Sequence, residues 1–501
     1  MSDTPVSQGN GHILGFGSKS YRTYVLVALT LIYTLNFIDR TLITVVAQPI
    51  MNELGLSDSQ FGFLTGPPFA IFYALMGIPI ALVADRSNRV IVISICIVIW
   101  SLMTVFCGFA AGFLWLILFR IGVAIGEAGG TPPANSILTD YFPIKSRANA
   151  IGIYSMGVTL GAVLAQVFGG SIAGISGPDF GNWLSSIGLG GLFSSIDWTT
   201  VSGWRIAFVI VGAPGILIGI LLWLTVKEPP RGYTELPGSH TQEKAGFTDG
   251  FKEFAKSRTF WWGALGASFT SLVGYGLQSF QAPFLQRVYD IGVREAALYY
   301  GAPLALAAAA GTFLGGFTSE KLEAKYHSVV AWLPSIGLTL AVPFYLAAFF
   351  APSISIAFPF WVAGAICHYS YLGAQYSIAT AIVSPKARAT SVAVLLFMVS
   401  LIGNGIGPLF VGMMSDFFMA TKISAAGLTE FARTFDPRTC SGAVFEAGTN
   451  ELAYCTAYAE GLRLSMGATA LWFLLAAFCF FMAGKTFNKD RWSKSEPPIG
   501  V

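Results

Sequence analysis

The chain has 501 residues, of which 54% are hydrophobic and 11% are charged, and its mean hydropathy is +0.65. Because soluble domains carry about 25% charged residues, this composition excludes a soluble globular protein and predicts an all-α integral membrane protein. The net charge of +3 does not indicate nucleic-acid binding, since Lys and Arg in such a chain are distributed by membrane topology.

Apolar stretches long enough to cross a bilayer recur along the whole chain. Runs of about 20 apolar residues mark membrane-spanning helices. The sequence predicts twelve spans, at about 23–50, 59–84, 90–110, 113–141, 147–175, 204–226, 259–288, 295–320, 328–350, 356–383, 388–418 and 463–484. We expect two six-helix bundles, 23–226 and 259–484, joined by a polar linker at 227–258 and flanked by tails at 1–22 and 485–501.

The distribution of Lys and Arg predicts the orientation. Every segment on the side of the N-terminus is positively charged, whereas most segments on the other side carry few positive residues. The positive-inside rule therefore places both termini in the cytoplasm. We expect a monomeric, multi-pass protein of the plasma membrane.

Four ionisable residues lie inside predicted spans of the first half: Asp39 and Arg40 in the first span, and Arg120 and Glu127 in the fourth. A charged residue at mid-membrane costs roughly 2.5–3.5 kcal/mol on insertion scales. Arg120 and Glu127 are two helical turns apart and share one face, so that face is expected to point away from lipid. Glycines at 122, 126 and 130 follow a neighbouring face, where small residues let another helix approach closely.

Charged helix ends repeat between the two halves. Asp85-Arg86 follows the second span and Glu320-Lys321 follows the eighth. The segment FPIKSRANAIG, with Lys145 and Arg147, corresponds to VSPKARATSVA, with Lys386 and Arg388. Parallel repeats of this kind indicate two bundles around a central axis, with a substrate site between them at mid-membrane.

The second half carries no ionisable residue at mid-span, apart from a histidine. Its polar residues there include Tyr369 and Gln375, and His368 lies beside them. His368 fits either a proton relay or a simple hydrogen bond, and the neighbouring tyrosines either line a lipid-tail cavity or pack against other helices. One bundle therefore supplies charge and the other supplies hydrogen bonds and aromatic surface, which suits an amphipathic substrate with one charged end.

Two of the six cysteines, Cys440 and Cys455, fall in the predicted outer loop 421–462. An oxidising compartment favours their pairing, and free thiols are the alternative. The other cysteines fall in spans and are expected to act as small apolar residues.

The residues Ala81, Asp85, Arg86, Asn88 and Arg89 resemble the signature of the major facilitator superfamily between its second and third spans, with Ala and Asn in place of two glycines. A second copy reads Gly316, Glu320 and Lys321. The resemblance implies a cytoplasmic gate formed by Asp85, Arg86, Arg89, Glu320 and Lys321, together with Arg147 and Arg388. A simpler alternative is that these charges only anchor helix ends.

Within that superfamily, the motifs Asn36-Phe37-Ile38-Asp39-Arg40, Gly126-Glu127-Ala128 and Thr139-Asp140-Tyr141-Phe142-Pro143 resemble the spinster family of lipid transporters. Members of this family are associated with transport of sphingosine-1-phosphate and lysophospholipids. The resemblance therefore implies an amphipathic lipid as the substrate.

The four mid-span charges also predict proton coupling. Burial and a nearby guanidinium shift the proton affinity of a carboxylate in opposite directions, and arginine does not lose its proton. The carried proton is therefore expected on Asp39 or Glu127. Its binding would free Arg40 or Arg120, with Asn36 nearby, to hold an anionic head group; static buried pairs are the alternative.

No nucleotide-binding loop, Cys/His metal cluster or nucleophile elbow occurs in the sequence, so we expect no cofactor, no metal and no enzymatic activity. The mid-span charges predict a proton-coupled secondary transporter, and the spinster resemblance implies export of a lysolipid-like or sphingolipid-like molecule, with the bilayer, protons and this substrate as partners. A transporter of a small organic anion is the alternative. A membrane-embedded lipid enzyme is disfavoured, because its charges would lie near one membrane face.

Overall fold

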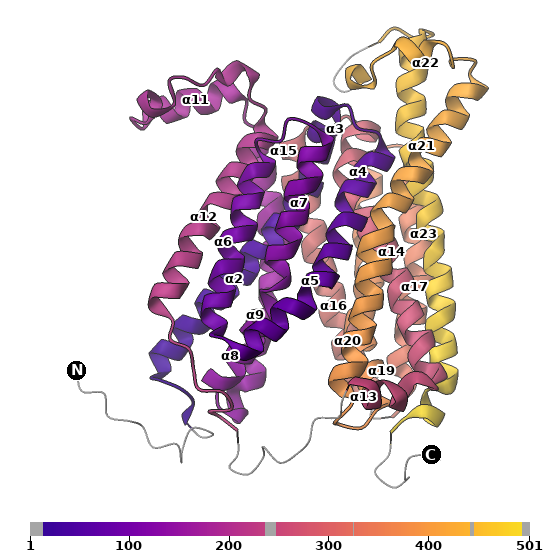
Figure 1. Cartoon of the computed structure of the whole chain (residues 1–501). Coiled ribbons are helices and arrows are strands. Elements are labelled where there is room, and N and C mark those ends of the chain that lie inside the picture. Colours follow the sequence, from indigo (N-terminus) through magenta and orange to yellow (C-terminus); the bar gives the residue numbers. More distant parts are fainter. Residues whose placement is uncertain (1–13, 236–246, 324, 441–444, 493–501) are drawn as a thin grey trace. The chain divides into compact units, whose positions relative to one another are not determined.

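The computed structural model describes residues 14–235, 247–323, 325–440 and 445–492, and these residues form helices joined by turns, without a β-strand (Figure 1). They divide into two compact units. Unit 1 contains the described residues of Met1–Pro49, Ile71–Glu243 and Val293–Leu298, and unit 2 contains those of Ile50–Ala70, Lys244–Gly292 and Tyr299–Val501. The predicted all-α membrane class is confirmed.

The main helices of unit 1 pack in two groups. Helix α2 lies along α9, and α6 lies between α7 and α12. The bounds are α2 Lys19–Val45, α5 Pro67–Arg86 (its first turn belongs to unit 2), α6 Arg89–Cys107, α7 Phe113–Ala128, α8 Thr131–Tyr141, α9 Ile144–Leu164, the π-helical η2 Ala165–Gly169, α10 Gly170–Ala173, α11 Gly177–Ser186, η3 Gly190–Phe193, η4 Trp198–Thr200, α12 Gly203–Thr225 and α15 Val293–Glu295.

Helix α23 is the centre of unit 2, because α14, α17 and α21 all pack against it. The bounds are α4 Asp58–Thr65, α13 Phe247–Ala255, α14 Arg258–Tyr289, α16 Ala302–Glu323, α17 Val329–Phe349, α18 Ile354–Tyr369, α19 Tyr371–Ala381, α20 Arg388–Met398, the π-helical η7 Val399–Ile406, α21 Gly407–Ala425, α22 Phe431–Thr434, η8 Pro437–Cys440 and α23 Asn450–Asp490. Helix α3 (Ala47–Leu54) and the π-helical η6 (Ala296–Gly301) cross the unit boundary.

Ten helical stretches among the described residues are long and apolar enough to cross a membrane. Two other predicted spans fall outside this set. The stretch 259–288 is helix α14, whose polar residues lower its hydropathy, and the stretch 356–383 is divided into α18 and α19 at Ser370.

Proline-containing motifs divide two of the spans. Helix α4 ends at Thr65 and α5 begins at Pro67, while α7 ends at Ala128 and α8 begins at Thr131. Proline is tolerated in the first turn of a helix because the amide it lacks has no intrahelical acceptor there. Pro79, by contrast, lies inside α5 without ending it.

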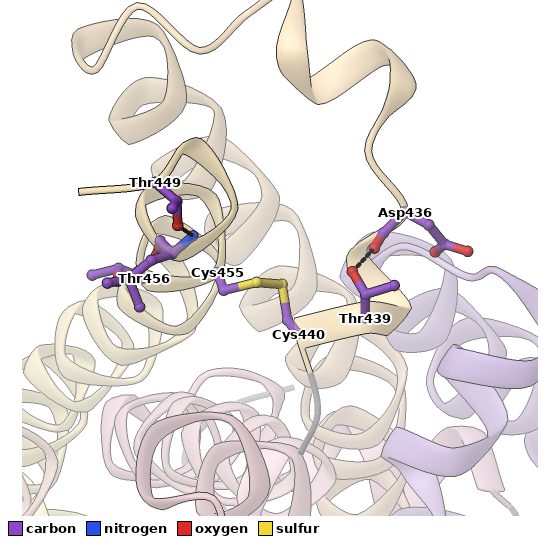
Figure 2. Close-up of a disulfide and its surroundings, with 7 residues drawn as sticks. Asp436, Thr439, Cys440, Thr449, Cys455 and Thr456 are labelled. Carbon is purple, nitrogen blue, oxygen red and sulfur yellow. Dashed lines mark hydrogen bonds between the residues drawn. A yellow bond between two sulfur atoms is a disulfide. The ribbon is translucent and has the colours of Figure 1, made fainter. Parts of the chain in front are cut away.

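The predicted outer loop 421–462 is largely helical, which corrects the expected start of the last span. Helix α23 begins at Asn450 rather than near residue 463, and the Thr449 hydroxyl accepts a hydrogen bond from the amide of Leu452 at its first turn. Cys440 and Cys455 form a disulfide with a Cα–Cα distance of 5.3 Å (Figure 2). This bond ties η8 to the extended start of α23.

The linker begins as an ordered strap on unit 1. The Thr234 hydroxyl donates to the carbonyl of Thr139 at 2.5 Å, and the amide of Gly232 donates to Asp140 at 2.9 Å. Its later part forms α13, a short helix. Residues 236–246, together with most of the predicted N-terminal tail and the end of the C-terminal tail, lie outside the described part.

Candidate functional site

Helix α7 carries two of the mid-span charges and lies tightly against α6. A Cβ atom added at Gly126 would lie 2.7 Å from the backbone nitrogen of Trp100, and one at Gly122 would lie 2.6 Å from the side chain of Met103. The predicted close helix approach at these two glycines is therefore confirmed, and the partner is α6. This contact fixes the direction in which Glu127 and Arg120 project.

The four predicted charges come together in unit 1, and we call Asp39, Arg40, Arg120 and Glu127 the mid-span cluster. Arg40 Nε pairs with Glu127 Oε2. Asp39 interacts electrostatically with both Glu127 and Arg120. Asp39, Arg120 and Glu127 are buried, whereas the side chain of Arg40 keeps 22% of its surface exposed. Arg40 is thus the cluster's contact with the surroundings.

The two acids of the mid-span cluster are incompletely satisfied. Glu127 Oε1 and Asp39 Oδ1 are buried and accept no hydrogen bond from the residues that the structure describes. A buried polar atom without a partner costs about 1–3 kcal/mol, and more when it is charged. Asn36 approaches Glu127 and is itself buried. An acid in this position gains from a proton or from a new donor.

Three further residues contact the mid-span cluster, and the sequence analysis missed them. The Arg40 guanidinium lies 4.5 Å from the ring centre of Tyr73. Trp100 and Thr104 approach the carboxyl group of Asp39 from α6. They lie one helical turn apart, so a polar stripe within the third span was the signal that could have identified them.

The predicted polar residues of unit 2 lie among aromatic rings. His368 is buried, and its Nδ1 lies 3.2 Å from the hydroxyl of Tyr345. Its ring centre is 4.4 Å from that of Tyr369. Gln375 is buried, and its Oε1 accepts no hydrogen bond within the described ranges. His368 therefore has a hydrogen-bond partner in Tyr345, which both interpretations of this residue allow.

A second charged cluster lies in unit 2, and the sequence analysis did not single it out. Arg287 donates two hydrogen bonds to Asp58, Nη1 to Oδ2 at 2.8 Å and Nη2 to Oδ1 at 2.6 Å. Ser415 donates to Asp58 Oδ2 at 2.5 Å. Both side chains of the ion pair are almost fully buried. Arg287 also lies over the ring of Tyr458.

The same cluster also binds the first backbone amides of α4. Asp416 accepts the amide protons of Asp58 at 3.2 Å and of Ser59 at 2.9 Å. These amides are among the first of a helix and have no intrahelical acceptor, and an acid there also meets the positive end of the helix dipole. We call Asp58, Arg287, Ser415 and Asp416 the terminal cluster, since the start of α4 and the end of α14 meet there against the middle of α21.

The residues predicted to form a cytoplasmic gate divide into two groups. Arg89 and Arg147 are engaged within unit 1. The first binds Asp140 at 2.5 Å and Glu228 at 2.6 Å, and the second donates to Thr234 at 2.8 Å. The others are exposed, and no ion pair joins them within the part of the chain that the structure describes: Asp85, Arg86, Glu320, Lys321 and Arg388.

Known proteins share this architecture. The family model of the Major Facilitator Superfamily matches residues 29–408. A crystal structure described as a bacterial homolog of the human lysosomal transporter Spinster, in an inward-facing and unoccupied conformation, is 64% identical, with a TM-score of 0.91. The match covers 96% of this chain and 100% of that chain.

Two curated relatives are more distant. An MFS-type efflux pump of Mycolicibacterium smegmatis is 29% identical over 77% of this chain and 83% of its own length. A probable L-galactonate transporter of Escherichia coli is 24% identical over 61% of this chain and 63% of its own length. Proteins of this kind carry small molecules across membranes and are not enzymes. The chain therefore belongs to the major facilitator superfamily and, within it, to the spinster family of transporters.

Proposed function

We propose that this protein couples proton movement to the export of an amphipathic lipid of the lysolipid or sphingolipid type by alternating access. The mid-span cluster carries this proposal, because it holds two acids and two arginines together in a buried position. Intramembrane charges are rare and mark ion or substrate pathways. Static ion pairs alone would not explain why two buried carboxylates each keep an oxygen without a hydrogen bond within the described residues.

The charges of the mid-span cluster cancel when both acids are ionised. One proton on Asp39 or Glu127 leaves a net positive charge on Arg40 and Arg120. That charge favours an anionic head group, with Asn36 as an additional polar contact. In the reverse direction, an anion held by Arg40 raises the affinity of the neighbouring acid for a proton. Proton and head group therefore bind cooperatively in this proposal.

The rest of the substrate is proposed to use the uncharged polar and aromatic side chains of unit 2, including Tyr369 and Gln375. The solved relative is described as a homolog of a lysosomal transporter named Spinster, a family associated with lipid substrates. The name of the efflux pump relative supports export as the direction. A phosphate-bearing lipid with one acyl chain combines the charge and the apolar length that the two units offer.

We propose twelve spans for the membrane arrangement, with α14 and the α18–α19 pair completing the ten helices that meet the length and hydropathy criteria. The bundles are 23–226 and 259–484, the linker is 227–258, and the tails are 1–22 and 485–501. Both termini are cytoplasmic, and the protein is a monomer in the plasma membrane. The concentration of Lys and Arg on one side of the chain supports this orientation.

Alternating access requires gates at both membrane faces. We propose that Asp85, Arg86, Arg89, Arg147, Glu320, Lys321 and Arg388 act at the cytoplasmic face. The terminal cluster acts at the opposite face, where it attaches α4 to α14 and α21. One boundary between the two units falls inside the second predicted span, near residue 70, so the two parts of this span belong to different units.

Transport of a small organic anion is the second candidate, and the resemblance to a probable L-galactonate transporter favours it. In that case Arg40 and Arg120 would bind a carboxylate. The hydrogen-bonding side chains of unit 2 would then contact hydroxyl groups instead of an acyl chain.

A reconstituted-liposome assay distinguishes these functions. We would measure uptake of a panel of lysolipids, sphingosine-1-phosphate and L-galactonate at two opposite pH gradients. The matched control is the Glu127→Gln protein at the same density. The proposal predicts lipid movement that changes with the gradient in the wild type only. Transport of galactonate alone would establish the second candidate. Lipid transport at a rate independent of the pH gradient would show that transport is not coupled to protons.

A further inference from the structure

The segment that joins α10 to α12 folds into a short helical hairpin in unit 1. It contains α11, η3 and η4, and in Figure 1 it extends sideways from the end of α12, across the direction of the long helices. The Ser176 hydroxyl caps α11 by accepting the amide proton of Asp179 at 3.2 Å, and Asp197 accepts that of Thr199 at 3.0 Å. Gly203, at the start of α12, packs on the carbonyl of Ala173. The hairpin is therefore an ordered element tied to the ends of two spans.

Aromatic rings give the hairpin its own small core. The ring of Phe180 lies 5.4 Å from those of both Trp183 and Trp198, and Phe193 lies 6.5 Å from Trp198. Gly181 faces the Trp198 ring so closely that a Cβ atom would lie 2.6 Å away. These contacts fix the shape of residues 176–202, so the side chains left outside this core are held in place.

Large apolar side chains on the hairpin remain exposed. Leu192 keeps 76% of its surface exposed and Trp183 keeps 52%. The exposed set is Trp183, Ile187, Leu189, Leu192, Phe193 and Ile196. An ordered apolar surface of this kind marks an interaction site.

The charge of the hairpin identifies the partner. Between residues 174 and 204 the chain contains Asp179 and Asp197 and no Lys or Arg, so electrostatic attraction to anionic lipids or acidic proteins contributes nothing. The exposed apolar surface continues along the chain into Phe168 and Ile175 at the end of the preceding span. Exposed apolar residues of a span face lipid, and Trp with Leu and Ile suits the boundary between head groups and acyl chains.

We propose that residues 176–202 form an interfacial anchor, which lies in the head-group region and inserts its apolar side chains into the acyl boundary of the bilayer. Unlike a basic membrane-binding helix, this anchor binds zwitterionic and anionic membranes alike. It holds the joined ends of α10 and α12 at a fixed depth.

The test uses the full chain with its four free cysteines replaced, reconstituted in phosphatidylcholine vesicles at a high lipid ratio. A nitroxide is attached at Leu192→Cys and, as the matched control, at Asn182→Cys on the polar face of α11. Power-saturation spectroscopy then compares the accessibility of each label to oxygen and to a water-soluble nickel chelate. Ile196→Cys provides a second apolar site if Leu192→Cys does not fold.

We expect the ratio of oxygen to chelate accessibility to be several-fold higher at 192 and 196 than at 182. Adding phosphatidylglycerol to the vesicles should leave this ratio unchanged. Chelate accessibility as high at 192 and 196 as at 182 would overturn the proposal. Dipolar broadening between labels of two chains would also overturn it, because the surface would then be covered by a second copy.

Discussion

The mid-span cluster and the terminal cluster use the same residue types with opposite degrees of satisfaction. In the terminal cluster, both carboxylate oxygens of Asp58 and of Asp416 accept hydrogen bonds. In the mid-span cluster, Asp39 and Glu127 each keep one buried oxygen that accepts no hydrogen bond within the described residues. A carboxylate whose oxygens all accept hydrogen bonds is held in one arrangement, whereas an incompletely satisfied one can still gain a donor or a proton. We therefore propose that the terminal cluster is a structural lock and that the mid-span cluster is a proton sensor.

The largest effect on transport is expected from Glu127→Gln, which replaces an acid of the mid-span cluster by an amide of the same shape. Proton-driven lipid transport should fall by at least about tenfold, since about 1.4 kcal/mol of lost coupling changes an equilibrium tenfold. Transport in proteoliposomes across a series of pH gradients measures it. Asp416→Asn is the control and should preserve the pH dependence of its remaining transport. Identical pH profiles for the wild type, Glu127→Gln and Asp39→Asn would contradict the proton role of the mid-span cluster.

Substitutions in the terminal cluster should lower the stability of the protein more than they change the pH dependence of transport. Asp58→Asn leaves the buried Arg287 guanidinium without its carboxylate, and removal of one partner from a buried pair costs about 3–5 kcal/mol. Thermal unfolding in detergent should therefore shift to a lower midpoint. The Asp58→Asn, Arg287→Gln double variant should recover part of the loss. A double variant less stable than the single one would show that the pair is not the lock.

A smaller loss is expected from Ser415→Ala, because Ser415 supplies one hydrogen bond to the charged Asp58. Hydrogen bonds to charged groups contribute about 1.5–3 kcal/mol. Chemical unfolding of this variant, compared with Ser424→Ala on the same helix, would give the difference. Equal stability of the two variants would place the stabilisation elsewhere in the cluster.

The smallest effect is expected from Tyr345→Phe, which removes the hydroxyl beside His368. A neutral hydrogen bond contributes about 0.5–1.5 kcal/mol, and the pH dependence of transport should not change. A shifted pH profile of transport in Tyr345→Phe would instead indicate that His368 takes part in proton transfer.

The sequence identified the mid-span cluster because Asp39, Arg40, Arg120 and Glu127 stand out inside apolar spans. It did not identify the terminal cluster, since Asp58 and Arg287 lie at helix ends, where charges are ordinary, and are far apart along the chain. Long-range pairing of this kind depends on how helices pack, which periodicity does not encode. The spinster resemblance and the helical class were both predictable from local motifs and apolar runs.

Boundaries were less predictable than the existence of helices. The last span was expected from residue 463, but α23 begins at Asn450 because Thr449 caps it and the Cys440–Cys455 disulfide secures its first turns. Trp100, Thr104 and Tyr73 were missed because each is unremarkable alone. The fold brings them to Asp39 and Arg40.

The most direct test of the sensor counts protons as the substrate binds. An anionic lysolipid is added to the purified protein in weakly buffered detergent solution, and the pH change is recorded for the wild type and for the Asp39→Asn, Glu127→Gln double variant. The account predicts uptake of about one proton per lipid bound at a pH where the acid is ionised in the free protein, and none in the double variant. Lipid binding without proton uptake by the wild type at any pH, or equal uptake by both proteins, would contradict it.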